Sequence, residues 1–260
     1  MLNAVFGPVK SGKMIVLMPL ALALLLSPPA EATCLVRAYP EHLCGFETAG
    51  VRTCRGELWP WDDGRPKSDW ERFTSPDLED MFAERYPATE AWPPAPLTDP
   101  GRVRYEPLFE RMYGGSPEAV RARLVPVRWF GRVVRVHAAN GVAEGLRAVA
   151  ADLAKLPASL RPFFARTAGT FNWRVIKGTS TRSLHSYGIA IDVGVERADY
   201  WRWVPGAASS PAPPPYRNRF PREVVEAFER HGFIWGGRWA HFDTMHFEYR
   251  PELLCARSGG

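Results

Sequence analysis

The sequence lacks the short signatures of several large enzyme classes. No Ser-x-x-Lys and no Gly-x-Ser-x-Gly stretch occurs, so neither the penicillin-type serine peptidases nor the α/β-hydrolases are supported. His-Glu-x-x-His is also absent, which excludes the commonest class of metalloprotease. The cysteines form no Cys-x-x-Cys pair, so a thiolate zinc site is not expected.

The apolar run near the N-terminus is too short to span a membrane. Met14–Leu26 contains 13 residues, whereas a transmembrane helix needs about 20. Lys10 and Lys13 precede the run, and the small-x-small sequence Ala30–Ala32 follows it. This pattern predicts a secretory signal peptide over residues 1–32, and hence an exported protein of the periplasm or cell envelope with no membrane span after cleavage. An uncleaved membrane anchor is the competing interpretation.

The chain also has no dense run of one charge. Its formal net charge is +5, and it falls to +4 when Lys10, Lys13 and Glu31 leave with the predicted signal. A weakly basic exported protein suits an anionic polymer, although the arginines are spread along the whole chain. No helix-turn-helix or RNA-binding signature is present, so nucleic acid is not an expected partner.

Cysteine is scarce, but every cysteine follows the predicted signal. The four residues are Cys34, Cys44, Cys54 and Cys255. An even number in an oxidising compartment predicts two disulfides, and three pairings are open. Three of the cysteines lie in residues 33–98, a tryptophan-rich segment that we interpret as a small cap or arm. Clustered prolines around residues 92–101 then lead into a main domain at residues 99–260.

The main domain mixes strand and helix patterns without regular alternation. Residues 133–137 alternate as a strand, and Asn140 is expected to cap the helix that follows. Pro221 is expected to open a second helix, and FIWGGRW at residues 233–239 predicts a hairpin with a Gly-Gly turn. This mixture favours an α+β fold with a mostly antiparallel sheet.

The most informative stretch is SLHSYGIAID, from Ser183 to Asp192. In an extended strand its branched residues share one face, while Ala190 and Asp192 share the other. Gly188 permits a sharp turn into the strand, which can return His185 over the second face. One imidazole and one carboxylate can then converge.

A second stretch, WAHFDTMHFEY, places Asp243 and His246 three residues apart. A bend before His246 would put both on one side, whereas in a fully extended strand they would face opposite ways. His185, Asp192 and His246 can then hold zinc with three N/O ligands and leave the fourth position for water, as in catalytic sites. Asp243 would take a proton from that water and pass it to the leaving amine. Glu248, on the same strand face as His246, is the alternative base.

The two stretches resemble one family. SLHSYGIAID matches Ser-x-His-x-x-Gly-x-Ala-x-Asp and DTMH matches Asp/Glu-x-x-His, the motifs of the VanY-type D-alanyl-D-alanine carboxypeptidases and the related L-alanyl-D-glutamate endopeptidases. The similarity covers roughly residues 99–254. It implies a compact zinc domain like that of hedgehog proteins, with one zinc ion held by His185, Asp192 and His246 and with Asp243 as the base.

The resemblance also implies an arginine that steadies the oxyanion and a serine that helps to hold the substrate. Arg174 is the candidate for the first role and must be distinguished from Arg182 beside the motif; Ser183 is the candidate for the second. We therefore expect a zinc-dependent peptidase that hydrolyses peptidoglycan stem peptides, either as a D-Ala-D-Ala carboxypeptidase or as an L-Ala-D-Glu endopeptidase. A non-catalytic, zinc-stabilised cell-wall binding module is the alternative, and the retained Asp243 argues against it.

Overall fold

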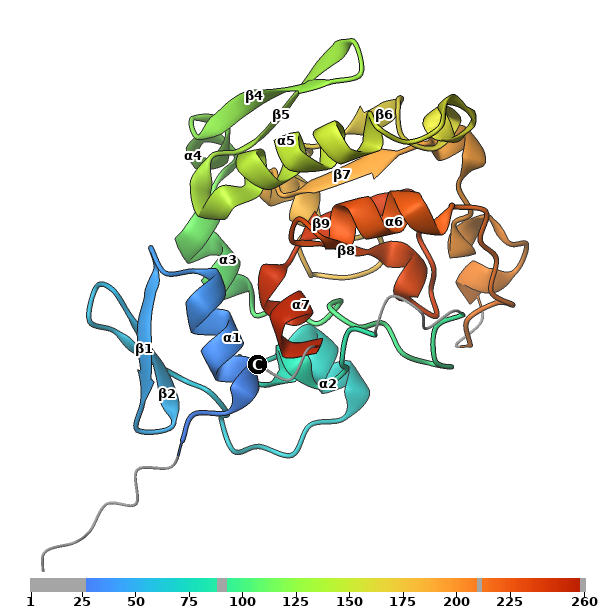
Figure 1. Ribbon diagram of the computed structural model, residues 1–260. Helices are drawn as coiled ribbons and strands as arrows, with labels where there is room; N and C mark the ends of the chain where they lie inside the picture. The colour runs from blue at the N-terminus through green and yellow to red at the C-terminus, as the bar shows by residue number, and fades with distance from the viewer. Residues whose placement is uncertain (1–26, 88–92, 210–211, 258–260) are drawn as a thin grey trace, which may run out of the picture.

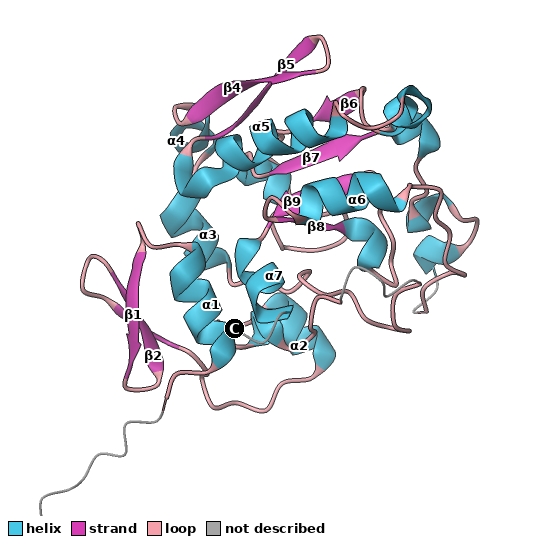
Figure 2. Cartoon of the chain, in the orientation of Figure 1, coloured by secondary structure: helices cyan, strands magenta, loops and turns pink. Residues whose placement is uncertain are grey.

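The computed structural model of the protein describes residues 27–87, 93–209 and 212–257. Residues 1–26, which hold most of the predicted signal peptide, lie outside the described part. Helices and antiparallel strands follow one another irregularly, so the predicted α+β class with antiparallel sheets is confirmed (Figure 2).

The α-helices are α1 Ala30–Ala38, α2 Asp69–Thr74, α3 Glu106–Tyr113, α4 Pro117–Arg121, α5 Val142–Leu153, α6 Arg222–Glu229 and α7 Pro251–Arg257. The strands are β1 Leu43–Glu47, β2 Gly50–Thr53, β3 Leu58–Pro60, β4 Leu124–Trp129, β5 Arg132–His137, β6 Thr167–Gly169, β7 Ala190–Val193, β8 Phe233–Trp235 and β9 His246–Tyr249.

Within the described ranges the strands form three antiparallel sheets. The first contains β1, β2 and β3, the second is the β4–β5 hairpin, and the central sheet has the order β6-β7-β9-β8. Figure 1 shows the β4–β5 hairpin at one end of the molecule and the N-terminal sheet near the other. The central sheet contains both motif stretches, because Asp192 lies on β7 and His246 begins β9.

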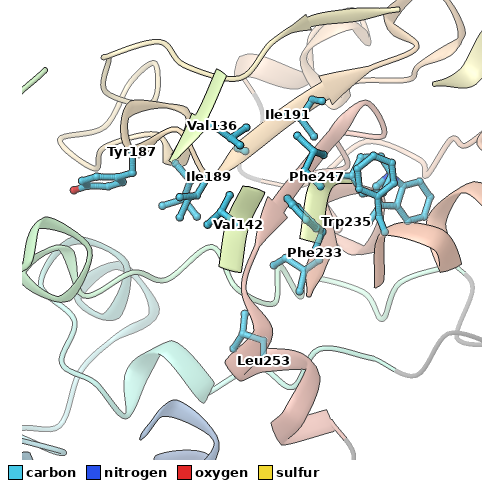
Figure 3. Packing of buried hydrophobic residues seen from close by; sticks show 14 of the residues in the cluster. Val136, Val142, Tyr187, Ile189, Ile191, Phe233, Trp235, Phe247 and Leu253 are labelled. Atoms are coloured by element: carbon cyan, nitrogen blue, oxygen red, sulfur yellow. The ribbon is translucent and has the colours of Figure 1, made fainter. Parts of the chain in front are cut away.

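One face of the central sheet packs against helices. Ile189 and Ile191 are fully buried and belong to one apolar cluster with residues of α5 and α6 (Figure 3). On β9, Phe247 stacks on Phe228 of α6 with ring centroids 3.8 Å apart. A slip of one residue would turn this apolar set toward the opposite face. The packing therefore holds β7 in the register that leaves Asp192 on the other side of the sheet.

The hairpin expected at residues 233–239 has a different second strand. β8 does pair with β9, but β9 begins only at His246. Gly236 and Gly237 belong to the short 3₁₀ helix Gly236–Arg238, and neither has the positive φ that a two-residue type I′ turn requires. The connection is therefore longer than predicted, and it includes Asp243.

The helix start expected at Asn140 is also wrong by one residue. Gly141, with φ +80°, precedes α5, and no side chain caps the helix there. Asn140 has φ +60°, whereas a capping asparagine takes an extended conformation. At the second predicted helix, Pro221 directly precedes α6, as expected.

The N-terminal segment is joined to the end of the chain. α1 packs against α7, and Cys34 in α1 forms a disulfide with Cys255 in α7. The second disulfide, between Cys44 and Cys54, connects β1 to the residue that follows β2. The two predicted disulfides are thus present, and the structure selects one of the three pairings.

Helix α1 begins inside the segment predicted as a signal peptide. Ala30–Ala32 form its first turn, and Ala32 is fully buried. In the described part of the chain, no helix has both the length and the apolar character needed to cross a membrane.

Candidate metal centre and active-site cleft

Three polar side chains from separate stretches meet at the central sheet. His185 Nε2 and His246 Nδ1 each lie 3.1 Å from Asp192 Oδ1, and the two nitrogens are 3.2 Å apart. Ligand atoms of a tetrahedral zinc ion at normal bond lengths lie about 3.3–3.4 Å apart. Two imidazole nitrogens and a carboxylate oxygen converging in a triangle of nearly this size are a donor set for a divalent metal. The three residues therefore fit one zinc ion.

Strand pairing brings two of these residues together, and a glycine turn adds the third. Asp192 on β7 lies directly opposite His246 on β9. His185 belongs to the 3₁₀ turn Leu184–Tyr187, after which Gly188 takes φ +68°. A Cβ atom at Gly188 would lie 2.6 Å from a methyl group of Leu124, so this turn requires glycine for both its conformation and its space.

The second ring nitrogen of each histidine also has a partner. His185 Nδ1 lies 3.1 Å from the carbonyl oxygen of Thr170, and His246 Nε2 lies 2.9 Å from Glu248 Oε2. Such partners set the tautomer and the orientation of a metal-binding imidazole. They leave His185 Nε2 and His246 Nδ1, which face each other, available for a metal.

Buried charges surround His246. Burial opposes ionisation of Glu248, but Arg104, which donates to it at 2.7 Å, and His246 together lower the pKa of Glu248 to about 2. Burial also lowers the pKa of His246, yet hydrogen bonds to Asp192 and Glu248 offset this and raise that pKa to about 10. Burial of Asp192 is likewise outweighed, because His185 and His246 hold the pKa of that carboxyl below its usual range. Without a cation, His246 is therefore protonated at neutral pH, and metal binding would release this proton.

Asp243 lies on the turn that leads into β9. The His246 N–H donates to the Asp243 carbonyl oxygen at 3.1 Å, so the bend that the motif requires is present. Asp243 Oδ1 is buried without a hydrogen-bond partner in the described part of the chain, and burial raises the pKa of this carboxyl to about 7. The alternative base, Glu248, is fully buried and ion-paired to Arg104. Asp243 and His246 line a cleft beside the triad of His185, Asp192 and His246, whereas Glu248 does not line it.

The lining of the cleft distinguishes the two candidate arginines, Arg174 and Arg182. Among the residues that line it are His246, Asp243, Ser183, Arg102, Arg104 and Arg174. Arg174 is exposed. The Arg182 side chain lies elsewhere, because its guanidinium is 4.3 Å from the centre of the Trp173 ring and 3.9 Å from Glu110 of α3. Arg174 is thus the one of the two that lines the cleft.

The sequence patterns did not point to every residue of this site. Arg102 and Arg104 belong to the stretch DPGRVRYEP, which neither motif covers. Arg104 is 4% exposed, and its Nε and Nη1 atoms have no partner among the described residues. Two arginines directly after a proline-rich connector were the available signal. No sequence signal could have pointed to the Thr170 carbonyl, because every residue type supplies a main-chain oxygen.

Comparison with known protein families finds one that matches part of the chain. Residues 177–249 match the model of a family described as D-alanyl-D-alanine carboxypeptidase. Neither the curated proteins nor the solved structures gave a significant match to the chain. The matched segment contains the triad, Ser183 and Asp243, and it supports a peptidase that acts on peptidoglycan. The resemblance of this part of the chain to the VanY-type D-alanyl-D-alanine carboxypeptidase family is thereby confirmed.

Proposed function

We propose that the protein is a zinc-dependent peptidase that removes the terminal D-Ala from peptidoglycan stem peptides. His185, Asp192 and His246 would hold one zinc ion, which supplies a Lewis acid for the scissile carbonyl and lowers the pKa of a water molecule. The observation that carries the proposal is the triangle of ligand atoms, 3.1–3.2 Å on each side, within the segment that matches the carboxypeptidase family.

Three further side chains have proposed roles in the reaction. Asp243, whose Oδ1 is buried without a partner among the described residues, accepts a proton and passes it to the leaving amine. Arg174 stabilises the negative charge that develops on the carbonyl oxygen. Ser183 lines the same cleft and holds the substrate through a hydrogen bond.

The charges of the cleft favour a carboxypeptidase. Arg102, Arg104 and Arg174 line it, and Asp243 is the single acid among its described lining residues. Arg102 and Arg104 also pair with Asp99 and Glu248, whereas Arg174 forms no ion pair with a described residue. Arginine binds carboxylates strongly and with defined geometry, so this cleft suits a substrate with a free carboxylate next to the scissile bond. An L-Ala-D-Glu endopeptidase is the second candidate, because D-Glu also places a carboxylate close to the bond that is cut.

The remaining assignments follow from this activity. We propose residues 99–260 as the zinc peptidase domain, with a hedgehog-like zinc fold, and residues 33–98 as a cap joined to it by the Cys34–Cys255 disulfide. Residues 1–32 would direct export to the periplasm or cell envelope. The two disulfides support this location, because disulfides persist in oxidising compartments.

The direct test is digestion of purified cell wall and of a synthetic stem pentapeptide, with mass spectrometry of the products. Wild-type protein should release D-Ala, and a chelator should abolish the release until zinc is restored. Loss of a general base typically costs 10²–10⁴-fold in rate, so Asp243→Asn should bind zinc yet cut about that much more slowly.

Each other outcome has a distinct meaning. Release of a fragment cut between L-Ala and D-Glu would replace the carboxypeptidase with the endopeptidase. Wall binding without any cleavage would favour the non-catalytic module. An Asp243→Asn variant that cuts as fast as wild type would refute the assigned base.

A further inference from the structure

A second and larger groove, of about 660 Å³, lies between β5 and β6, away from the active-site cleft. Both of these strands are edge strands among the described residues, since β5 pairs there only with β4 and β6 only with β7. Thr170 Oγ1 donates to the Arg135 carbonyl oxygen at 2.6 Å and joins the two walls at one point. Edge strands present unpaired backbone N–H and C=O groups, which an extended peptide can bind by adding a strand.

The groove is basic. Arg121, Arg132 and Arg135 line it, and none of its described lining residues is acidic. Arg121 has an exposed ion pair with Glu118 at 3.5 Å, but Arg132 and Arg135 form no ion pair with an acid of the described chain. Val133, also on the wall, is 63% exposed. The groove therefore combines free strand edges, an apolar contact and uncompensated positive charge, which suit an extended peptide that carries carboxylates.

The segment at the end of β6 lies between the groove and the metal centre. Gly169, at the end of this strand, pairs with Asp192, and the carbonyl oxygen of Thr170 contacts His185 Nδ1 at 3.1 Å. Gly169 and Thr170 both line the groove. One wall of the groove is thus the same segment that positions two of the three metal-binding residues.

We propose that the β5–β6 groove binds the upstream part of the substrate, namely an extended stem peptide with a free side-chain or α-carboxylate. The inference rests on the proposed peptidase function, because it identifies the peptide as the substrate. In this arrangement Arg102, Arg104 and Arg174 bind the C-terminal carboxylate of the peptide at the active-site cleft. Arg132 and Arg135 take a carboxylate farther from the scissile bond, while the strand edges bind the peptide backbone.

The test measures binding separately from cleavage. A fluorescent synthetic stem pentapeptide with its D-Glu carboxylate free is titrated against the zinc-loaded Asp243→Asn protein, and its anisotropy is followed. Exposed ion pairs are individually weak, so adding Arg132→Ala and Arg135→Ala together should weaken binding by roughly tenfold. Arg128→Ala is the matched control, because this exposed arginine of the same hairpin does not line the groove, and it should leave the affinity within twofold.

Two further measurements complete the test. The same peptide with its D-Glu carboxylate amidated should bind more weakly to protein with intact arginines and should be insensitive to the double substitution. In the cleaving enzyme, the double substitution should reduce the ratio of kcat/KM for the pentapeptide to kcat/KM for D-Ala-D-Ala.

Unchanged affinity in the double variant, or an equal loss in Arg128→Ala, would overturn the proposed groove. Tight, arginine-dependent binding with no cleavage by wild type would instead refute the proposed function and retain the groove.

Discussion

Two groups of side chains in the described part of this protein bring three possible metal ligands within 4.8 Å of one another, and they differ in what lies beside them. The first group is His185, Asp192 and His246; the second is Asp62, Asp63 and Asp77. Beside the second group, Lys67 Nζ lies 3.2 Å from Asp63, 2.7 Å from Asp77 and 2.6 Å from Asp80. No lysine or arginine of the described chain forms an ion pair with Asp192.

This difference indicates which group is the better candidate for a metal site. The ammonium group of Lys67 already supplies the positive charge that the acidic group needs, and its side chain is only 6% exposed. In the histidine triad the positive charge is instead a proton on His246, which a metal ion would displace, and the outer contacts orient both imidazoles toward one point. A count of possible ligands alone would not distinguish the two groups, because each offers three.

The largest effect in this comparison is expected at Lys67. Removing one partner of a buried ion pair costs about 3–5 kcal/mol, so Lys67→Gln should lower the free energy of unfolding by about that amount, measured by urea denaturation. Lys155→Gln is the control, because Lys155 is 74% exposed in its pair with Asp152, and the loss should stay below about 1 kcal/mol. Equal small losses of unfolding free energy in both variants would mean that Lys67 does not neutralise the acidic group.

A smaller effect is expected at Glu248. Replacing an outer partner of a metal-binding histidine typically costs 10–100-fold in metal affinity, so Glu248→Gln should weaken zinc binding by roughly that factor. Competition with a chromophoric chelator measures the change. Glu223→Gln, an exposed substitution on α6, should leave zinc affinity unchanged. If Glu248→Gln binds zinc as tightly as wild type, the buried carboxylate does not help to orient His246.

The sequence predicted the parts of the site that depend on local periodicity. The alternation in β7 placed its apolar residues on one face and Asp192 on the other, because strand periodicity is strict and one face is packed. The turn between Asp243 and His246 followed from their spacing, since only a bend puts both on one side. The central role of Gly188 followed from its place between His185 and β7.

Features set by distant contacts could not be predicted in the same way. The Gly-Gly stretch at residues 236–237 forms a 3₁₀ helix rather than a tight turn. A Cβ at Gly236 would lie 2.6 Å from the Asp243 carbonyl oxygen, so this glycine serves the close approach of a later segment. The disulfide partner of Cys34 lies 221 residues away. The groove between β5 and β6 likewise depends on how two separate sheets meet.

The most direct test is anomalous diffraction at the zinc edge from crystals of protein that holds one equivalent of zinc. The account predicts one peak, with His185 Nε2, Asp192 Oδ1 and His246 Nδ1 each about 2.0–2.2 Å from it. A peak among Asp62, Asp63 and Asp77, or a zinc ion bound without one of the three predicted ligands, would contradict it.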